Sequence, residues 1–191
     1  MGRLKTLRSL TILNQPYFAG FRSLASNGLD KPVLNVFRMF ARMRGQRLQV
    51  ESDGAIPLEE MVRSGVRARP DVAALASLDQ RTLCVLIWHY HDDDVPGPDA
   101  EVELAFDQLP SANGEATLQH FRIDEEHSNA FAAWKRLGSP QAPTPEQYAR
   151  LEKAGHLAAL EPPRSMRVER GQATLKFKLP RQAVSLLQLA W

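Results

Sequence analysis

Little in this sequence marks it as a disulfide-linked, membrane-spanning or nucleic-acid-binding protein. Its 191 residues include one cysteine, which excludes an intrachain disulfide. That residue, Cys84, lies inside the apolar run TLCVLIW, so we expect an inert buried thiol. No run approaches the roughly 18 apolar residues that a membrane span needs. The formal net charge of +2 is small and the basic residues form no block, so we expect no nucleic-acid partner and no membrane partner.

An export signal is also missing. Residues 1–13 (MGRLKTLRSLTIL) are basic and then briefly apolar, but the apolar part is too short for a signal-peptide core and no small-residue cleavage site follows. A cytoplasmic location is therefore the default expectation. Residues 1–15 have no clear hydrophobic period, and their origin stays open.

Residues 30–44 form the clearest predicted helix. Asp30 is positioned to cap this helix, Pro32 suits its first turn and Gly45 suits its end. Apolar residues recur every three or four positions and make one stripe, which needs a large apolar surface to lie on. The stripe comprises Leu29, Val33, Val36, Phe37 and Phe40.

From residue 48 onward the apolar period changes to two, which is typical of β-strands. Residues 81–91 are apolar on both faces for most of their length, as expected of a central strand. Residues 101–107 alternate apolar and acidic side chains, as expected of a strand with one wet face. The predicted strands cover residues 72–78, 81–91, 101–107, 116–123, 173–179 and 184–191.

Two dipeptides predict tight turns between these strands. Asn113-Gly114 tolerates positive φ at both positions, so it predicts a hairpin between the strands on either side of it. Arg170-Gly171 likewise predicts that residues 166–169 pair with the strand that follows them.

A helical insert interrupts the β pattern at about residues 127–155. Its first helix, over residues 127–137, places Phe131 and Trp134 on one face and ends at Gly138. Its second helix begins with Thr144-Pro145-Glu146-Gln147, a capping box with proline in the first turn. The composition, 43% hydrophobic and 24% charged, is ordinary for a globular protein. We predict a mainly β fold: an antiparallel β-sandwich over residues 46–191 with a small two-helix insert, preceded by the helix in residues 1–45.

Three segments resemble the family 39 glycoside hydrolases, the bacterial β-xylosidases. FAGFRSLASNGLDKPVLNVFRMF, which contains Gly28-Leu29-Asp30-Lys31-Pro32, resembles the last βα unit of their catalytic barrel. HYHDDDVPGP and HSNAFAAWKRLGSPQAPTPEQYARLEKAG resemble their β-sandwich and its helical insert. The resemblance covers roughly residues 16–191. It implies that residues 1–45 are a remnant of a (β/α)8 barrel and that residues 46–191 are an accessory domain.

The resemblance implies a parent enzyme that releases xylose from xylo-oligosaccharides with retention. Retention requires two carboxyl groups about 5–5.5 Å apart. In the family the acid/base glutamate follows an asparagine, and the nucleophile lies on the seventh barrel strand. This sequence has no Asn-Glu dipeptide and begins after the position of that strand. We therefore expect an accessory region that is inactive alone, with no catalytic residue and no cofactor. The alternative is a carbohydrate-binding or oligomerisation module.

Aromatic residues near the start are candidates for the rim of the parent's substrate pocket. Tyr17, Phe18 and Phe21 would lie in a loop after a barrel strand, and such loops face the active site. The alternative is that they pack between loop and barrel. Three tryptophans, Trp88, Trp134 and Trp191, are candidates for a sugar-stacking platform, although the first two lie in apolar patterns that favour core packing.

A cluster of histidines and aspartates is a weak candidate for a metal site. A hard cation such as calcium would favour the aspartates and backbone carbonyls. The alternative is a strand that runs into a solvated turn, because Asp, Pro and Gly are good turn residues. The cluster comprises His89, His91, Asp92, Asp93 and Asp94, and we predict no metal there.

The resemblance also predicts self-association. A lone barrel helix over residues 30–44 would expose Phe37 and Phe40 and would need a partner surface. In the family the amino terminus of the enzyme adds a strand to the sandwich, so a chain without it would keep an unpaired sheet edge. We expect contact between copies through the helix or through that edge.

Overall fold

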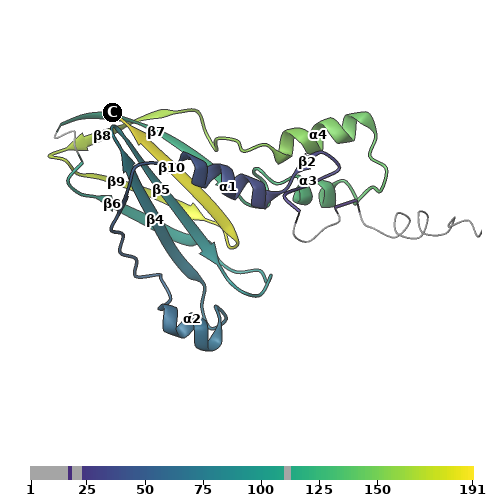
Figure 1. Cartoon of the computed structure of the whole chain (residues 1–191), viewed down its shortest axis with the longest axis horizontal. Helices are drawn as coiled ribbons and strands as arrows, with labels where there is room; N and C mark the ends of the chain where they lie inside the picture. The colour runs from purple at the N-terminus through teal and green to yellow at the C-terminus, as the bar shows by residue number, and fades with distance from the viewer. Residues whose placement is uncertain (1–16, 19–22, 110–112) are drawn as a thin grey trace, which may run out of the picture.

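The computed structural model describes residues 17–18, 23–109 and 113–191, and these form an antiparallel β-sandwich with helices at its margins (Figure 1). Within these residues the larger sheet has six strands in the order β3-β4-β5-β10-β7-β8, and β6 and β9 form the second layer. A short hairpin of β1 (Ala25–Ser26) and β2 (Leu29–Asp30) lies near the insert. The sandwich strands are β3 (Gln46–Leu48), β4 (Asp71–Asp79), β5 (Thr82–Tyr90), β6 (Ala100–Phe106), β7 (Asn113–Ile123), β8 (Arg164–Glu169), β9 (Ala173–Leu179) and β10 (Ala183–Ala190).

The main core lies between the two layers and confirms the predicted sandwich. Val85 and Ile87 of β5 point into this core together with Leu187 of β10, and Leu175 and Leu179 of β9 close it from the second layer. Alternate residues of a strand point to opposite faces, so the period-two pattern supplies this core directly.

The central strand β5 buries its other face as well, as the sequence predicts. Cys84 and Leu86 pack against Met39 of α1 (Pro32–Arg42), which covers the outer face of the large sheet. Burial raises the pKa of the Cys84 thiol, which donates a hydrogen bond to the carbonyl of Arg42. The expectation of a buried thiol is therefore confirmed.

Of the predicted apolar stripe, only Val36 packs against the sandwich. Only Leu29 is fully buried, while the side chains of Val33, Phe37 and Phe40 are exposed to solvent. Asn35 and Met39 face the protein instead. The expected cap is also wrong, because Lys31 is the N-cap and Asp30 instead accepts a hydrogen bond from Arg38. The helix thus carries two faces, and only one of them is covered by the described residues.

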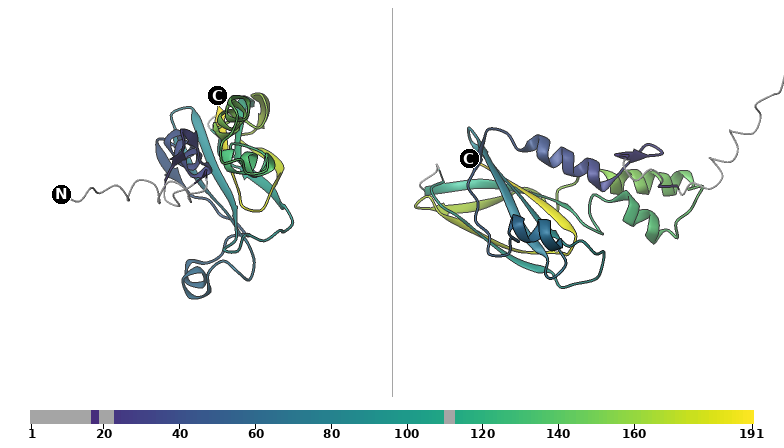
Figure 2. Two further views of the ribbon diagram at one scale, coloured as in Figure 1. Left: turned by 90° about the vertical axis from the view of Figure 1, so that its right-hand side faces the viewer. Right: turned by 60° about the horizontal axis from the view of Figure 1, so that its bottom comes forward.

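The insert forms as predicted, and a further helix appears. Helices α3 (Ala130–Arg136) and α4 (Pro145–Gly155) pack together, and Thr144 and Gln147 form the expected capping box. A short helix, α2 (Leu58–Ser64), protrudes from the sandwich away from α1 and the insert (Figures 1 and 2). In the described part of the chain no helix is long and apolar enough to cross a membrane.

The strand pairing predicted at both turns is wrong, although Arg170-Gly171 does form a tight turn that is closed by hydrogen bonds between Glu169 and Gln172. β6 pairs with β9 rather than with β7, and β8 pairs with β7 rather than with β9. Ion pairs across β6 and β9 support the observed pairing, since Lys178 lies 3.1 Å from Glu101 and Lys176 lies 2.9 Å from Glu103. At Arg170-Gly171 the chain passes from the large sheet to the second layer, whereas Asn113 and Gly114 lie inside β7 itself.

Candidate functional site

An aromatic cluster joins the start of the described chain to the insert. Tyr17 stacks on Trp134 with ring centroids 6.5 Å apart, and Phe18 lies 5.4 Å from Trp134 and 5.7 Å from Phe131. The Trp134 indole nitrogen donates a hydrogen bond of 2.8 Å to the carbonyl of Pro140. Two predicted rim residues therefore meet on the insert. The third, Phe21, lies outside the described residues.

Polar contacts fix the backbone of this cluster. The carbonyl of Tyr17 accepts hydrogen bonds from Ser26 and Asn27, and its N–H donates to Gln141. Burial, and then the neighbouring Tyr148, raise the pKa of the Tyr17 phenol. Phe131 remains 36% exposed, with the Lys135 ammonium 4.7 Å from its ring centroid. The cluster thus offers a fixed, partly exposed aromatic surface that can line a pocket or contact a sugar face.

The histidine and aspartate cluster holds a turn together. The Asp93 N–H donates to His91 Nδ1 at 3.0 Å, so His91 Nε2 carries the proton and donates to the carbonyl of Arg67. His89 Nδ1 lies 2.9 Å from the carbonyl oxygen of Leu179. Both histidines are buried, and Asp94 is exposed. Within the described residues no group of three or more His, Cys, Asp or Glu could hold a metal ion.

Asp92 organises the base of the same turn. It accepts hydrogen bonds from the Val66 N–H at 3.0 Å and from the Tyr90 hydroxyl at 3.1 Å, with Arg67 3.5 Å away. The hydrogen bond from Val66 is the main reason that the pKa of Asp92 is lowered. A carboxyl group held ionised in this way suits a structural bond rather than a general acid.

The three tryptophans belong to different parts of the molecule. Trp191 packs against the main core, and Trp134 belongs to the insert cluster. The indole nitrogen of Trp88 donates a 2.6 Å hydrogen bond to Asp71, which also accepts one from the N–H of Ile56. Because their contacts are separate, the three rings do not form one sugar-stacking platform.

A buried polar group in the main core was missed by the sequence analysis. His120 Nε2 lies 2.9 Å from the Ser185 hydroxyl oxygen, which accepts a hydrogen bond from Arg122 Nε at 3.2 Å. Burial, and then the Arg122 charge, lower the pKa of His120 to about 4. The hydroxyl is completely buried and faces a guanidinium, so this group is structural rather than a nucleophile with its base.

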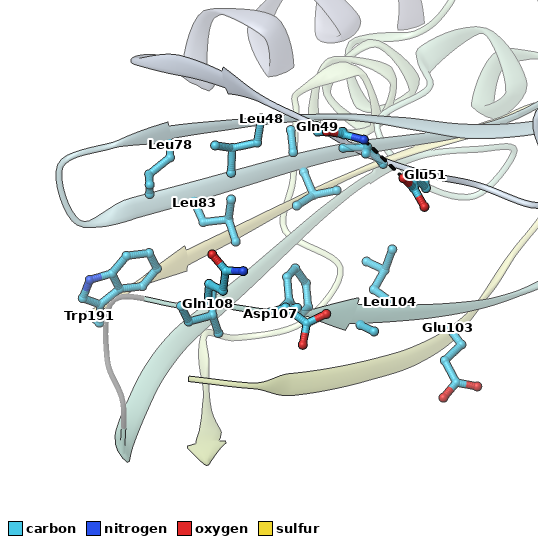
Figure 3. A pocket seen from close by; sticks show the side chains of 16 residues that line it. Leu48, Gln49, Glu51, Leu78, Leu83, Glu103, Leu104, Asp107, Gln108 and Trp191 are labelled. Carbon is cyan, nitrogen blue, oxygen red and sulfur yellow. Dashed lines mark hydrogen bonds between the residues drawn. The ribbon is translucent and has the colours of Figure 1, made fainter. Parts of the chain in front are cut away.

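A groove opens between β6 and the segment after β3. Figure 3 shows Leu48, Leu78, Leu83 and Trp191 around one hollow of about 450 Å³. A second hollow of about 510 Å³ continues along the same strand. Carboxylates rather than cations line both hollows.

Comparison with known proteins identifies the family. Residues 5–174 match the glycosyl hydrolases family 39. The chain belongs to this family. It is 22% identical over 142 residues to a β-xylosidase of Caldicellulosiruptor saccharolyticus and 30% identical over 169 residues to mouse α-L-iduronidase. These matches cover 74% and 84% of this chain but only 26% and 25% of the relatives, so the chain spans about a quarter of their length.

Solved structures of the same family share the fold. The family 39 enzyme of Xanthomonas axonopodis pv. citri has a TM-score of 0.68 at 18% identity, and the match covers 85% of this chain and 31% of that one. A monomeric β-xylosidase of Caulobacter crescentus CB15 has a TM-score of 0.67 at 18% identity, covering 92% and 34%. The resemblance inferred from the sequence is therefore confirmed, as is the relation to β-xylosidases.

Proposed function

We propose that this family 39 chain is the carboxyl-terminal accessory region of a retaining β-xylosidase and is inactive alone. The observation that carries the proposal is coverage: the chain matches only 26% of the length of its β-xylosidase relative. The described residues form a sandwich, an insert and a leading helix. Catalysis would then come from carboxyl groups on polypeptide outside this chain, acting on xylo-oligosaccharides.

The exposed face of α1 supports the proposal that this helix packs against a second domain. Phe37 is 57% exposed, and Val33 and Phe40 lie one turn away from it on the same exposed side. A helix that buries Met39 on one side and presents phenyl rings on the other is built to lie between two layers. Burying one such ring fully is worth about 1.5–3 kcal/mol. In the parent enzyme we assign the barrel wall to this face.

The aromatic cluster supports a role at the substrate pocket. Tyr17 and Phe18 precede the hairpin of β1 and β2 that leads into α1, and they are fixed to the insert through Trp134. If α1 docks on a barrel, these rings and Phe131 lie beside it, where they would form part of the pocket rim. The names of the two relatives, a β-xylosidase and an α-L-iduronidase, indicate different sugars. We therefore assign the choice of sugar to the part of the parent enzyme that lies outside this chain.

Without a barrel, the same α1 face would drive self-association. We expect the purified chain to elute as a dimer or larger species that dissociates on Phe37→Glu, because a charge cannot be buried in the contact. Val62→Glu is the matched control: Val62 lies on α2, is 80% exposed and should leave the mass unchanged. Multi-angle light scattering at rising concentration measures the mass. A strictly monomeric wild-type chain would contradict this part of the proposal.

The alternative is a carbohydrate-binding module. Retention of the purified chain on insoluble xylan distinguishes it from a supporting region that binds no sugar. The partly exposed Phe131 ring is the observation that favours it. Retention that is lost in Phe131→Ala would support this alternative over a purely supporting role.

A further inference from the structure

A basic hollow lies where the second half of α1 meets the segment that follows α4. Its volume is about 480 Å³, and it is lined by Arg38, Ala41, Arg42, His156 and Leu157. The two arginines and the histidine carry N–H groups, and no carboxylate lines the hollow. Ala41 is small and exposed, so its side chain leaves the space beside the arginines open. The hollow therefore combines free volume with an excess of positive charge.

Both guanidinium groups are held in place by contacts that leave part of each group available. Nη1 of Arg38 donates a hydrogen bond of 2.8 Å to Asn35 Oδ1. The Arg42 guanidinium lies 4.3 Å from the centroid of the Phe121 ring, and its Nη1 donates a 3.2 Å bond to Gln188. Among the described residues, the Nε and Nη2 groups of both arginines have no acceptor. Guanidinium groups that are oriented in this way lose little freedom when they bind an anion.

The charges around the hollow are only partly balanced. Asp30 forms an ion pair with Arg38, whereas no described carboxylate forms one with Arg42. The two arginines are four residues apart on one helix, and like charges at this spacing repel each other. The exposed ring of His156 makes no hydrogen bond to the described part of the chain. The dipole of α1 favours a cation in its last turn, but it does not explain why the space between these cations is left open.

We propose that this hollow binds a phosphate group. Such a group presents three strong acceptor oxygens, so it can accept hydrogen bonds from both guanidinium groups and from the imidazole. A carboxylate has two oxygens, which one arginine alone can satisfy. Inorganic phosphate and the phosphate ester of a sugar share this chemistry. The ligands Arg38, Arg42 and His156 all belong to this chain, so the site does not depend on the function proposed above.

Titration of inorganic phosphate into the full chain tests the site, with NMR signals of the His156 ring and of the arginine side-chain N–H groups as the readout. Sodium chloride at matched ionic strength is titrated in parallel. We expect saturable shifts with phosphate and not with chloride. Arg42→Gln should weaken phosphate binding by about tenfold or more, because a charge-assisted pair is lost. Arg150→Gln is the matched control, since Arg150 is an exposed cation of α4 outside the hollow, and it should leave binding unchanged.

A second variant, His156→Ala, keeps the test decisive if Arg42→Gln fails to fold. His156 is exposed, so this variant should unfold at the same urea concentration as the wild type while it binds phosphate more weakly. Shifts that rise linearly with phosphate, or that chloride reproduces, would overturn the proposal, because they would indicate charge screening rather than a site. Equal binding by Arg42→Gln and Arg150→Gln would overturn it as well.

Glucose 6-phosphate then distinguishes the two sources of the phosphate group. Binding as tight as that of inorganic phosphate would assign recognition to the phosphate group alone. Tighter binding that Arg42→Gln weakens to the same degree would show that the hollow also contacts the sugar. Binding of glucose 6-phosphate that is insensitive to Arg42→Gln would contradict the assigned ligands.

Discussion

Replacing Asn35 should separate α1 from the insert. This amide is completely buried in α1, and its Nδ2 donates hydrogen bonds of 2.9 Å to the carbonyl of Ser128 and 2.6 Å to that of Gly155. Its Oδ1 accepts a 2.8 Å bond from Arg38. One side chain thus ties the helix to both ends of the insert. Asn35→Ala would leave two buried carbonyl oxygens without their donor.

The expected loss follows from the cost of unsatisfied groups. A buried polar group left without its partner costs about 1–3 kcal/mol, so two carbonyls imply a loss near 3 kcal/mol after partial relaxation. Urea unfolding followed by circular dichroism measures the free energy of unfolding by linear extrapolation. Gln172→Ala removes an exposed amide that donates one bond to Asp107, and it should cost under about 0.5 kcal/mol.

A second control measures how much free energy of unfolding is lost through poorer packing alone. Met39→Ala lies one turn further along the same buried face and should cost about 2–5 kcal/mol through its cavity alone. It should not loosen the insert, whereas Asn35→Ala should also increase proteolysis between α3 and α4. An Asn35→Ala variant as stable as the Gln172→Ala variant would refute the reasoning, because the two buried bonds would then contribute nothing.

Three further predictions concern pH, a helix cap and the protruding segment. The pKa of His120 is about 4 in the folded protein against 6.5 in the unfolded chain. The unfolded state therefore binds more protons between these values. The free energy of unfolding falls as the pH drops from 6.5 to 4, by about 3 kcal/mol in all. Urea unfolding at pH 7, 5 and 4 should show this slope reduced in His120→Gln but kept in a variant of the exposed His156, and an unchanged slope would contradict the assignment. Thr144→Ala removes the cap of α4 and should cost about 1 kcal/mol in the same assay, whereas no loss would mean that the cap is idle. Asp71→Ala removes the acceptor for Trp88 and Ile56, so limited proteolysis near α2 should accelerate, and an unchanged cleavage rate would count against this anchor.

The sequence predicts the strands well because the period of burial is local. Residues 81–91 are apolar on both faces, and β5 indeed packs between α1 and the β6–β9 layer. The capping box of α4 is equally local and is confirmed. Each of these features depends on neighbours within a few residues, so a pattern in one chain is enough to find it.

Strand pairing and polar burial depend on distant residues, and there the sequence analysis falls short. Asn113-Gly114 is typical of a turn, but both residues lie in β7, and β6 and β9 are held together by lysines and glutamates more than 70 positions apart. The apolar stripe of α1 predicts a buried face without identifying the surface that covers it. His120 and Ser185 give no local signal, since each becomes a partner only through the register of β7 and β10.

The sequence analysis identified part of the aromatic cluster on the insert. The sequence pointed to Tyr17 and Phe18 as rim candidates, and the structure places both on Trp134, which the sequence assigned to the insert. Their meeting depends on the fold of α3 against the hairpin of β1 and β2, which no spacing reveals. Their role at a substrate pocket stays a prediction.

The most direct test of the account is hydrolysis of p-nitrophenyl β-xyloside by the purified chain, measured across the sizing-column peak against a buffer blank. We predict no turnover above the blank in any fraction, because we propose that the catalytic carboxyl pair lies on polypeptide outside this chain. Turnover that follows the protein peak and scales with its concentration would contradict the accessory role and require a carboxyl pair within these 191 residues.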